Sequence, residues 1–138
     1  MDEQDRIIVE SLMKNARTSK SALARRLNLT EAAIRKRLMK LESSGTVLGY
    51  RAIIDYQKAE LVASVTGVDT EPDKLWKVIE QLKMLDEVKT VMLTSGDHMM
   101  LAEIVVESMD GLEEAHEKIE GFEGVVRVCP AILIKSIK

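Results

Sequence analysis

Apolar residues in the first third of the chain recur at helical spacing. Ile34, Leu38 and Leu41 stand at positions i, i+4 and i+7, so they form one face of a helix that must pack against a core. Thr30 comes just before this helix, where its hydroxyl can accept a free backbone N–H. Gly45 comes just after it, where glycine can adopt the left-handed conformation that ends many helices. The pattern predicts a helix between these two residues.

Two shorter helical patterns precede this one. Residues 2–14 begin with acidic side chains, which suit the positive end of a helix dipole, and continue with an apolar face that includes Ile8 and Leu12. Residues 19–27 form the next pattern, and Asn28 follows where the chain must reverse, because asparagine tolerates a positive φ. Two helices joined by such a turn are the layout of a helix-turn-helix.

The pattern changes after these helices. Residues 46–54 are rich in β-forming residues and are expected to continue as an extended, wing-like segment. Residues 55–61 are short and polar, so they are the predicted linker. This division predicts a winged-helix-like helix-turn-helix domain at residues 1–54 and a second domain at residues 62–138.

Strand and helix patterns alternate through the second domain. The expected strands are Val62–Val68, Val88–Ser95, Met99–Glu107 and Val125–Ile137, and the expected helices are Asp73–Leu85 and Asp110–Glu120. Positions 37 residues apart carry matching apolar side chains, for example Leu82 and Ile119 in the helices and Val88 and Val125 in the strands. The domain is therefore a duplicated βαβ unit. The order βαββαβ predicts a ferredoxin-like α+β fold, with one antiparallel sheet and both helices on one face.

The other face of this predicted sheet has no helix to cover it. Apolar residues occupy both faces of strands such as residues 101–106 (LAEIVV), so the uncovered face needs a partner. We expect that partner to be a second copy of the chain, which makes the protein a homodimer.

Charge is divided unequally along the chain, although the formal net charge is only −3. Residues 1–55 carry 11 basic and 7 acidic side chains, whereas residues 56–138 carry 9 basic and 16 acidic ones. Nine basic residues and a single acidic one, Glu31, lie in the stretch from Lys14 to Lys40. Binding of a polyanion is therefore expected only in the N-terminal domain.

Basic residues of the third helix gather on the side opposite its apolar face. At about 100° per residue, that side presents Ala32, Lys36, Met39 and Lys40, flanked by Arg35 and Arg37. A basic amphipathic helix can simply be a solvated charged face, but the turn residue, the N-cap and the preceding helix favour DNA recognition. The nine basic residues also argue against a module that has lost DNA binding.

Other common chemistries have little support in this sequence. Cys129 is the only cysteine, so no intrachain disulfide forms, and we interpret it as a small core or interface residue. Two histidines and one cysteine, widely spaced, do not make a metal site, and no cofactor is expected. No apolar run approaches the roughly 20 residues needed to cross a bilayer, and the acidic start MDEQD is unlike a signal peptide. We expect a cytoplasmic protein with no membrane partner.

Several motifs in this order resemble those of the Lrp/AsnC (feast/famine) family of transcriptional regulators. The motifs are Asn15-Ala16-Arg17, Ala22-Leu23-Ala24, Leu29-Thr30, Arg37-Leu38-Met39-Lys40-Leu41-Glu42 before Gly45, and Gly49-Tyr50-Arg51-Ala52. The resemblance covers the whole chain. It implies a sequence-specific DNA-binding regulator whose C-terminal domain forms dimers and assemblies of dimers such as octamers, and binds an amino acid or another small molecule between subunits.

The resemblance also implies roles for individual residues on double-stranded DNA. It makes residues 30–43 the recognition helix, and two such helices, one per subunit, would enter successive major grooves of a roughly palindromic operator. Arg35 and Lys36 can donate to guanine, whereas Ala32 and Ala33 can offer only methyl contacts to thymine. The expected DNA contacts are Arg17, Ser19, Thr30, Ala32, Ala33, Arg35, Lys36, Arg37 and Lys40.

Three of these residues, Arg17, Ser19 and Arg37, are placed by the resemblance for contacts to phosphates. For Arg37, base reading is a further possibility, and an ion pair with Glu42 or a general phosphate contact is at least as well supported.

The expected effector loop departs from the family pattern. Family members usually read Gly-Asp-x-Asp after the central strand, with the second acid placed for the amino group of an effector, whereas this chain reads Gly96-Asp97-His98-Met99. Hydroxyl residues that meet the ligand in the family's last strand correspond here to residues 128–130, Val-Cys-Pro. The resemblance implies an effector site at Gly96, Asp97, His98 and Met99. Because an amino-acid zwitterion needs polar partners at both ends, a different ligand, or none, is the alternative.

The two histidines could carry other chemistry. His98 could contact a ligand, but we favour an exposed loop residue, and His116 takes the repeat position of Ile79, where we expect a half-buried side chain at the sheet edge. Some siroheme-type tetrapyrrole decarboxylases share the two-part architecture, which makes them the alternative function. After Tyr56 the chain offers such an enzyme only His98, His116 and Arg127, in no clustered motif, so we expect no enzyme activity.

Overall fold

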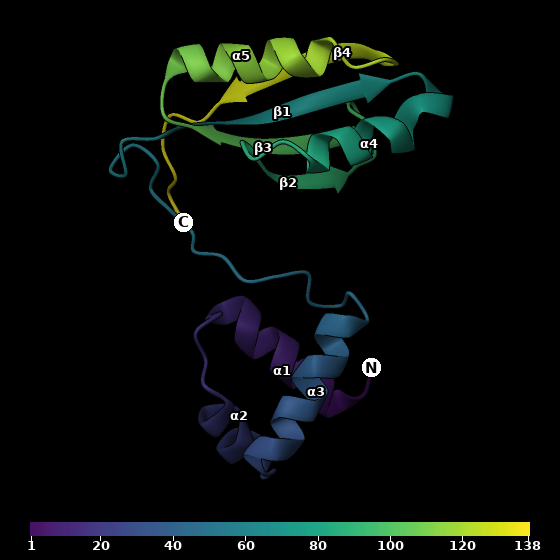
Figure 1. Ribbon diagram of the computed structural model, residues 1–138. Coiled ribbons are helices and arrows are strands. Elements are labelled where there is room, and N and C mark those ends of the chain that lie inside the picture. The colour runs from purple at the N-terminus through teal and green to yellow at the C-terminus, as the bar shows by residue number, and fades with distance from the viewer. The chain divides into compact units, whose positions relative to one another are not determined.

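The computed structural model describes residues 1–138 and divides them into two compact units, Met1–Ile53 and Ile54–Lys138 (Figure 1). Unit 1 contains the helices α1 (Glu3–Lys14), α2 (Lys20–Leu27) and α3 (Glu31–Ser43). Unit 2 contains, in chain order, β1 (Val62–Thr70), the 3-10 helix η1 (Pro72–Lys74), α4 (Leu75–Lys83), β2 (Val88–Leu93), β3 (Met100–Val106), α5 (Met109–Glu120) and β4 (Val125–Ile132).

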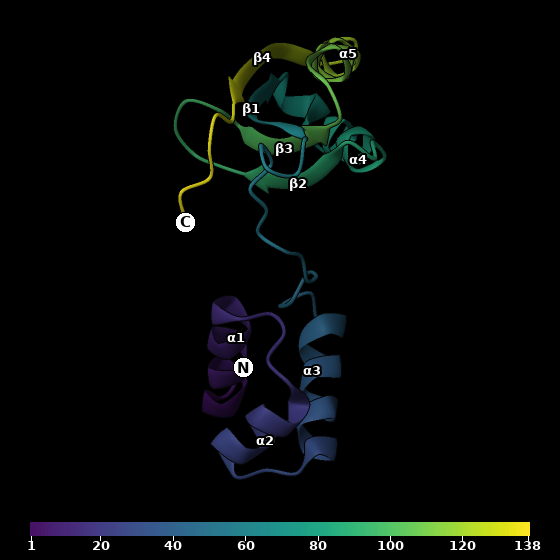
Figure 2. The ribbon, with the colours of Figure 1, turned by 90° about the vertical axis from the view of Figure 1, so that its left-hand side faces the viewer.

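Each helix of unit 1 begins at a side chain that caps it. The side chains of Asp2, Ser19 and Thr30 each accept the backbone N–H of the residue three positions later. Asn28 has a φ of 52° after α2, which confirms the predicted left-handed turn residue. The three helices enclose one core (Figure 2), and its buried residues are Ile8, Leu23, Ala24, Ile34, Leu38 and Leu41.

The wing-like segment forms no strand within unit 1. Gly45 has a φ of 72°, as predicted, but residues 46–54 pair with no other strand. A β-strand needs a neighbouring strand to satisfy its backbone N–H and C=O groups, and the three helices of unit 1 offer none. The segment is instead tied to α3 by Tyr50, which donates a hydrogen bond of 2.8 Å to Glu42.

Unit 2 is an antiparallel sheet with the strand order β2-β3-β1-β4 and with α4 and α5 on the same face (Figures 1 and 2). This order and layering confirm the predicted ferredoxin-like arrangement. Matching positions of the two halves meet in one core between the helices and the sheet. The core residues are Val68, Val78, Ile79, Leu82, Met100, Ala102, Ile104, Leu112, Ala115 and Ile119.

All six predicted elements of unit 2 are present, each with at least one bound that differs from the prediction by one to five residues. The first predicted helix begins at Leu75, because Pro72–Lys74 forms a separate 3-10 turn. The last strand ends at Ile132, which pairs with Ser64, rather than at Ile137. Its only neighbour, β1, begins two residues before Ser64, at Val62, so the last residues of the predicted strand have no partner there. Such an edge position also explains why a proline is tolerated inside β4.

His116 lies in α5 with its ring against β1. Its Nε2 is 2.8 Å from Thr66 Oγ1 and 3.4 Å from Ser64 Oγ, and all three side chains are buried. The expectation of a half-buried histidine missed these partners, which lie in a strand far away in the sequence. Burial lowers the pKa of His116, and the negative charge of Glu120 opposes this shift.

We expect His116→Ile to make the free energy of unfolding less dependent on pH below neutrality. Because the pKa of folded His116 is lowered, the unfolded chain takes up the proton first, so wild-type stability falls as the pH drops below about 6.5. Isoleucine does not titrate, and it is the natural residue at the matching repeat position, Ile79 in α4. Ser64 and Thr66 keep their mutual hydrogen bond of 2.9 Å when the histidine is replaced. Urea unfolding at about pH 7.5 and about pH 5.5 measures the difference. If the free energy of unfolding had the same pH dependence in wild type and in His116→Ile, burial would not hinder protonation of His116 in the folded protein.

Candidate DNA-binding surface and effector loop

The side of α3 that faces away from the core is cationic and has no internal partners. Arg35, Lys36 and Lys40 are exposed, and their side chains make no ion pair or hydrogen bond. Ala32 is exposed beside them, and Ala33 is partly covered. Because these cations keep all their N–H donors for a ligand, this side of α3 is suited to a polyanion such as DNA.

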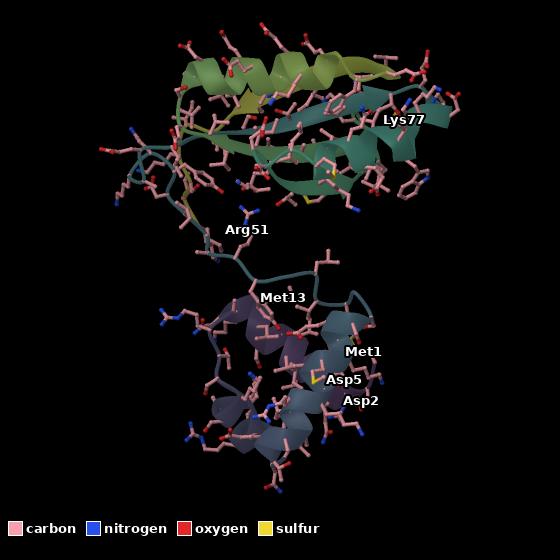
Figure 3. All side chains as sticks on the ribbon, in the orientation of Figure 1. Met1, Asp2, Asp5, Met13, Arg51 and Lys77 are labelled. Carbon is pink, nitrogen blue, oxygen red and sulfur yellow. The ribbon has the colours of Figure 1, made fainter.

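Arg37 differs from the other basic residues of α3 because its guanidinium contacts α1. Nη1 lies 2.7 Å from Asp2 Oδ2 and 2.7 Å from Asp5 Oδ1, and Nη2 donates to Gln4. Figure 3 shows Asp2 and Asp5 at the start of α1, next to α3. Hydrogen bonds to Asp2 and Asp5 raise the pKa of Arg37, so the ion pairs persist at any physiological pH.

The alternative partner that the sequence suggested for Arg37 is wrong. Glu42 accepts a hydrogen bond from Tyr50 instead, and it makes no ion pair with Arg37. The reason lies in tertiary structure, because the N-terminus of α1 packs close enough to α3 to offer two carboxylates. Arg37 therefore holds α3 against α1 in this structure.

Three further expected DNA contacts lie near α3 in unit 1. The hydroxyls of Ser19 and Thr30 accept the capping N–H groups at 3.0 Å and 3.1 Å, which leaves each O–H free to donate to a phosphate. Ser19, Lys20 and Arg35 line a hollow of about 740 Å³ between α2 and α3. Arg17 is exposed in the loop before α2, and its side chain has no partner.

The expected effector residues Gly96, Asp97, His98 and Met99 form the loop between β2 and β3. Gly96 has a φ of 108°, a conformation that favours glycine. Thr94 closes the loop, because its backbone N–H donates to Met99 O at 3.0 Å and its hydroxyl donates to His98 O at 2.7 Å. The carboxylate of Asp97 is exposed and makes no hydrogen bond.

Asp69 of β1 is the centre of the contacts that hold this loop. Its side chain is buried; Oδ1 accepts the Met99 N–H at 2.8 Å, and Oδ2 lies 3.0 Å from His98 Nδ1 and 2.8 Å from Arg127 Nε. Burial raises the pKa of Asp69, but the three donors outweigh it and hold the pKa at about 2. Asp69 is therefore ionised at neutral pH. Because a carboxylate only accepts, His98 donates from Nδ1.

Arg127 connects the loop to β4. Besides its bond to Asp69, it donates from Nη2 to the backbone oxygen of Asp97 at 2.7 Å. Its side chain is 54% exposed. Arg127 can therefore be reached from solvent, whereas the carboxylate that it pairs with cannot.

Gly67 makes room for His98 on the face of the sheet that the helices leave uncovered. A Cβ at this position would collide with the imidazole ring, so the ring lies where a side chain of β1 would otherwise stand. The expectation that His98 is an exposed loop residue is wrong, since its side chain is only 23% exposed and pairs with Asp69. Gly67 and Asp69 share a face of β1, which places the space and the carboxylate side by side.

Asp69 and Arg127 belong to this site although neither was expected in it from the sequence. The two residues are 58 positions apart and become neighbours only through the register of β1 and β4. A usable signal was present, because each is the only charged residue of its strand. Opposite charges in two strands of one sheet suggest a pair only after the strand order is known.

No helix is both long enough and apolar enough to span a bilayer. His, Cys, Asp and Glu side chains do not gather in groups of three or more that could hold a metal ion. Cys129 is a partly buried free thiol on β4, opposite Gly67 in β1.

Both units match known family models. Residues 1–47 match a model described as a winged helix-turn-helix DNA-binding domain, and residues 63–138 match the Lrp/AsnC ligand binding domain. The boundary between the two matches falls in the segment that follows α3.

Relatives and solved structures extend these matches over the full chain. The HTH-type transcriptional regulator LrpA of Pyrococcus horikoshii is 42% identical over 142 residues, which span 100% of this chain and 99% of that protein. LrpA1 of Halobacterium salinarum, another HTH-type transcriptional regulator, is 30% identical and spans 95% of this chain and 94% of that protein. The crystal structure of the Mycobacterium tuberculosis leucine response regulatory protein (LrpA) superposes with a TM-score of 0.79, at 27% identity, over 100% of this chain and 95% of that chain.

Proposed function

The chain belongs to the Lrp/AsnC family of transcriptional regulators, and we propose that it acts as a homodimer on a specific operator. Residues 1–54 bind DNA, residues 55–61 link the domains, and residues 62–138 form the dimer and sense an effector. The observation that carries the proposal is the outward face of α3, with three exposed cations that have no partner inside the protein. We propose that the protein acts in the compartment that holds the DNA.

On DNA, α3 lies in the major groove with its N-terminal half toward the bases. Arg35 and Lys36 donate to base edges, and Ala32 and Ala33 allow the helix to approach closely. Arg17, Ser19, Thr30 and Lys40 contact phosphates, whereas Arg37 keeps α3 in place through α1. The two copies of α3 in a dimer read half-sites about one helical turn, roughly 34 Å, apart.

Binding to a fragment of the protein's own promoter tests this function. We expect specific binding that is stronger than binding to a random duplex of the same length, with an affinity that falls steeply as salt is raised. Salt dependence arises because each cation that meets a phosphate releases condensed counterions. Equal affinity for both duplexes at every salt concentration would contradict a sequence-specific regulator.

The sheet face without helices is the proposed dimer surface. Val65, Leu101 and Val105 lie on this face, because they alternate along their strands with the core residues Val68 and Met100. Each of the three is partly exposed in a single subunit. A second copy buries these apolar side chains by contributing the same face, as a two-fold symmetric interface requires.

Leu101→Asp is expected to convert the dimer into a monomer. A carboxylate at this position would be buried in the interface without a partner. The free-energy cost of burying that unpaired charge exceeds the modest free energy that the two-fold contact contributes to dimer formation. Light scattering after size-exclusion chromatography should give a mass near 15.5 kDa for the variant and twice that for wild type. Trp76→Asp is the matched control, because Trp76 is 67% exposed on α4, away from the sheet face, and should leave the dimer intact. A dimeric Leu101→Asp chain would place the interface elsewhere.

The loop formed by Gly96, Asp97, His98 and Met99 is the proposed effector site. It lies within the residues that match the ligand-binding domain model, and its contacts to Asp69 and Arg127 give it charged groups of both signs. An amino acid also carries both charges, so this pair of groups is compatible with one. Titration of the promoter complex with each of the twenty amino acids tests the site directly.

A further inference from the structure

Three donors converge on the carboxylate of Asp69 from three parts of unit 2. They are the backbone N–H of Met99, the Nδ1–H of His98 and the Nε–H of Arg127, at 2.8, 3.0 and 2.8 Å. A main-chain N–H, an imidazole and a guanidinium directed at one point are the groups by which proteins bind a carboxylate. Two of these donors belong to residues that we assign to the effector site. The same donors cannot serve Asp69 and an incoming carboxylate together.

We propose that the effector loop contains a carboxylate-binding site whose occupant is the chain's own Asp69, and that a carboxylate effector acts by displacing it. This inference rests on the proposed effector function of the loop. It names the class of ligand, a small carboxylic acid, and it identifies Asp69 as the residue that competes with that ligand. A neutral or purely cationic molecule has no group to exchange for Asp69.

The surroundings of the three donors permit such an exchange. In a single subunit the side chain of Arg127 is 54% exposed and that of Asp69 is 12% exposed, so the guanidinium is the more accessible of the two groups for a ligand. Gly67 provides the space that the imidazole of His98 occupies, which keeps this donor beside Asp69. Release of Asp69 breaks its bond to Met99 N–H, which is one of the contacts that hold the loop before β3. Displacement therefore changes the conformation of the loop as well as its charge.

Competition by an internal carboxylate lowers the apparent affinity for an external one. The apparent dissociation constant equals the intrinsic dissociation constant divided by the fraction of molecules in which Asp69 has left the site. Removal of the Asp69 carboxylate should remove this competition. Asp69→Ala should therefore bind a small carboxylate at least about tenfold more tightly than wild type does.

Acetate is the probe for this experiment, because it is the side chain of aspartate without the backbone. Full-length wild type and Asp69→Ala are titrated with sodium acetate at constant ionic strength, and the ¹H–¹⁵N signal of Met99 and the thermal midpoint are followed. We expect acetate to shift the Met99 signal of the variant at a concentration at least tenfold lower than in wild type, and to raise its midpoint. Acetamide, which has the same shape without the charge, should do neither.

Asp86→Ala is the control, because Asp86 is an exposed carboxylate outside the effector loop whose side chain makes no hydrogen bond. This variant should bind acetate as weakly as wild type. Asp69→Ala/Arg127→Gln should lose the gained acetate affinity, since one of the three donors is gone. If Asp69→Ala does not fold, Asp69→Asn keeps the shape and an acceptor for Met99 N–H, and it should still bind acetate more tightly than wild type.

Equal acetate affinity of wild type and the folded Asp69 variants would overturn the inference. So would acetate binding to Asp69→Ala that is unchanged by the loss of Arg127. Binding of wild type to its promoter fragment is measured on the same samples. Failure of that binding contradicts the proposed function, whereas failure of the acetate response with DNA binding intact contradicts only the assignment of Asp69 as the internal occupant.

Discussion

Replacement of both Lys36 and Lys40 by glutamate is expected to weaken DNA binding by more than about 100-fold. Both side chains lie on the exposed side of α3 and have no partner within the protein, so a dimer loses four positive charges and gains four negative ones at the DNA. The plot of log affinity against log salt should become flatter, by about 0.9 for each phosphate contact that is lost. Fluorescence anisotropy with the promoter fragment at several salt concentrations measures both quantities.

The same two substitutions should leave the fold and the dimer unchanged. Neither lysine touches the core of unit 1, and neither belongs to the sheet face of unit 2. Changes at exposed positions of this kind usually alter stability by less than about 0.5 kcal/mol. Lys58→Glu/Lys138→Glu changes the charge of two exposed, unpaired lysines outside the helix-turn-helix and is the control for net charge alone. Unaltered affinity of the Lys36→Glu/Lys40→Glu variant would show that another surface meets the DNA.

Arg37→Leu is expected to destabilise unit 1 by about 2 kcal/mol. The Arg37 side chain is only 27% exposed, and loss of its guanidinium leaves the buried carboxylate of Asp5 without its cation. Leucine fills much of the space that the aliphatic part of arginine occupied, so the lost ion pair dominates the effect. Circular dichroism of urea unfolding measures the change in the helical signal.

Two companion variants separate this structural role from a contact with DNA. Asp5→Asn in the Arg37→Leu background should recover most of the lost stability, because the amide keeps an acceptor for the Asp2 backbone N–H without a buried charge. Arg35→Leu should behave in the opposite way, with weaker DNA binding and little change in stability, because Arg35 is exposed and unpaired. If Arg37→Leu keeps its stability and loses DNA affinity as Arg35→Leu does, Arg37 is a phosphate contact.

The helix-turn-helix and the duplicated βαβ unit could be predicted because their signals are local. Helical spacing of Ile34, Leu38 and Leu41, the cap at Thr30 and the left-handed turn at Asn28 each depend on residues within a few positions of one another. The repeat of 37 residues then determined the layering of unit 2, since two equal βαβ halves have one compact way to share a sheet. The basic face of α3 needed only the geometry of a helix.

Only the tertiary structure decided which residues the charged and polar side chains contact. Arg37 pairs with α1 rather than with Glu42 of its own helix, and His116 meets the hydroxyls of β1. Asp69 and Arg127 become one site only because β1 and β4 are neighbours in the sheet.

The absence of a strand in residues 46–54 has the same origin. A segment rich in β-forming residues becomes a strand only where another strand is available to pair with it, and unit 1 has none. Periodicity and capping thus determined the elements of this protein and their order. Hydrogen bonds and ion pairs between distant residues depend on the register and packing of those elements, which no local pattern specifies.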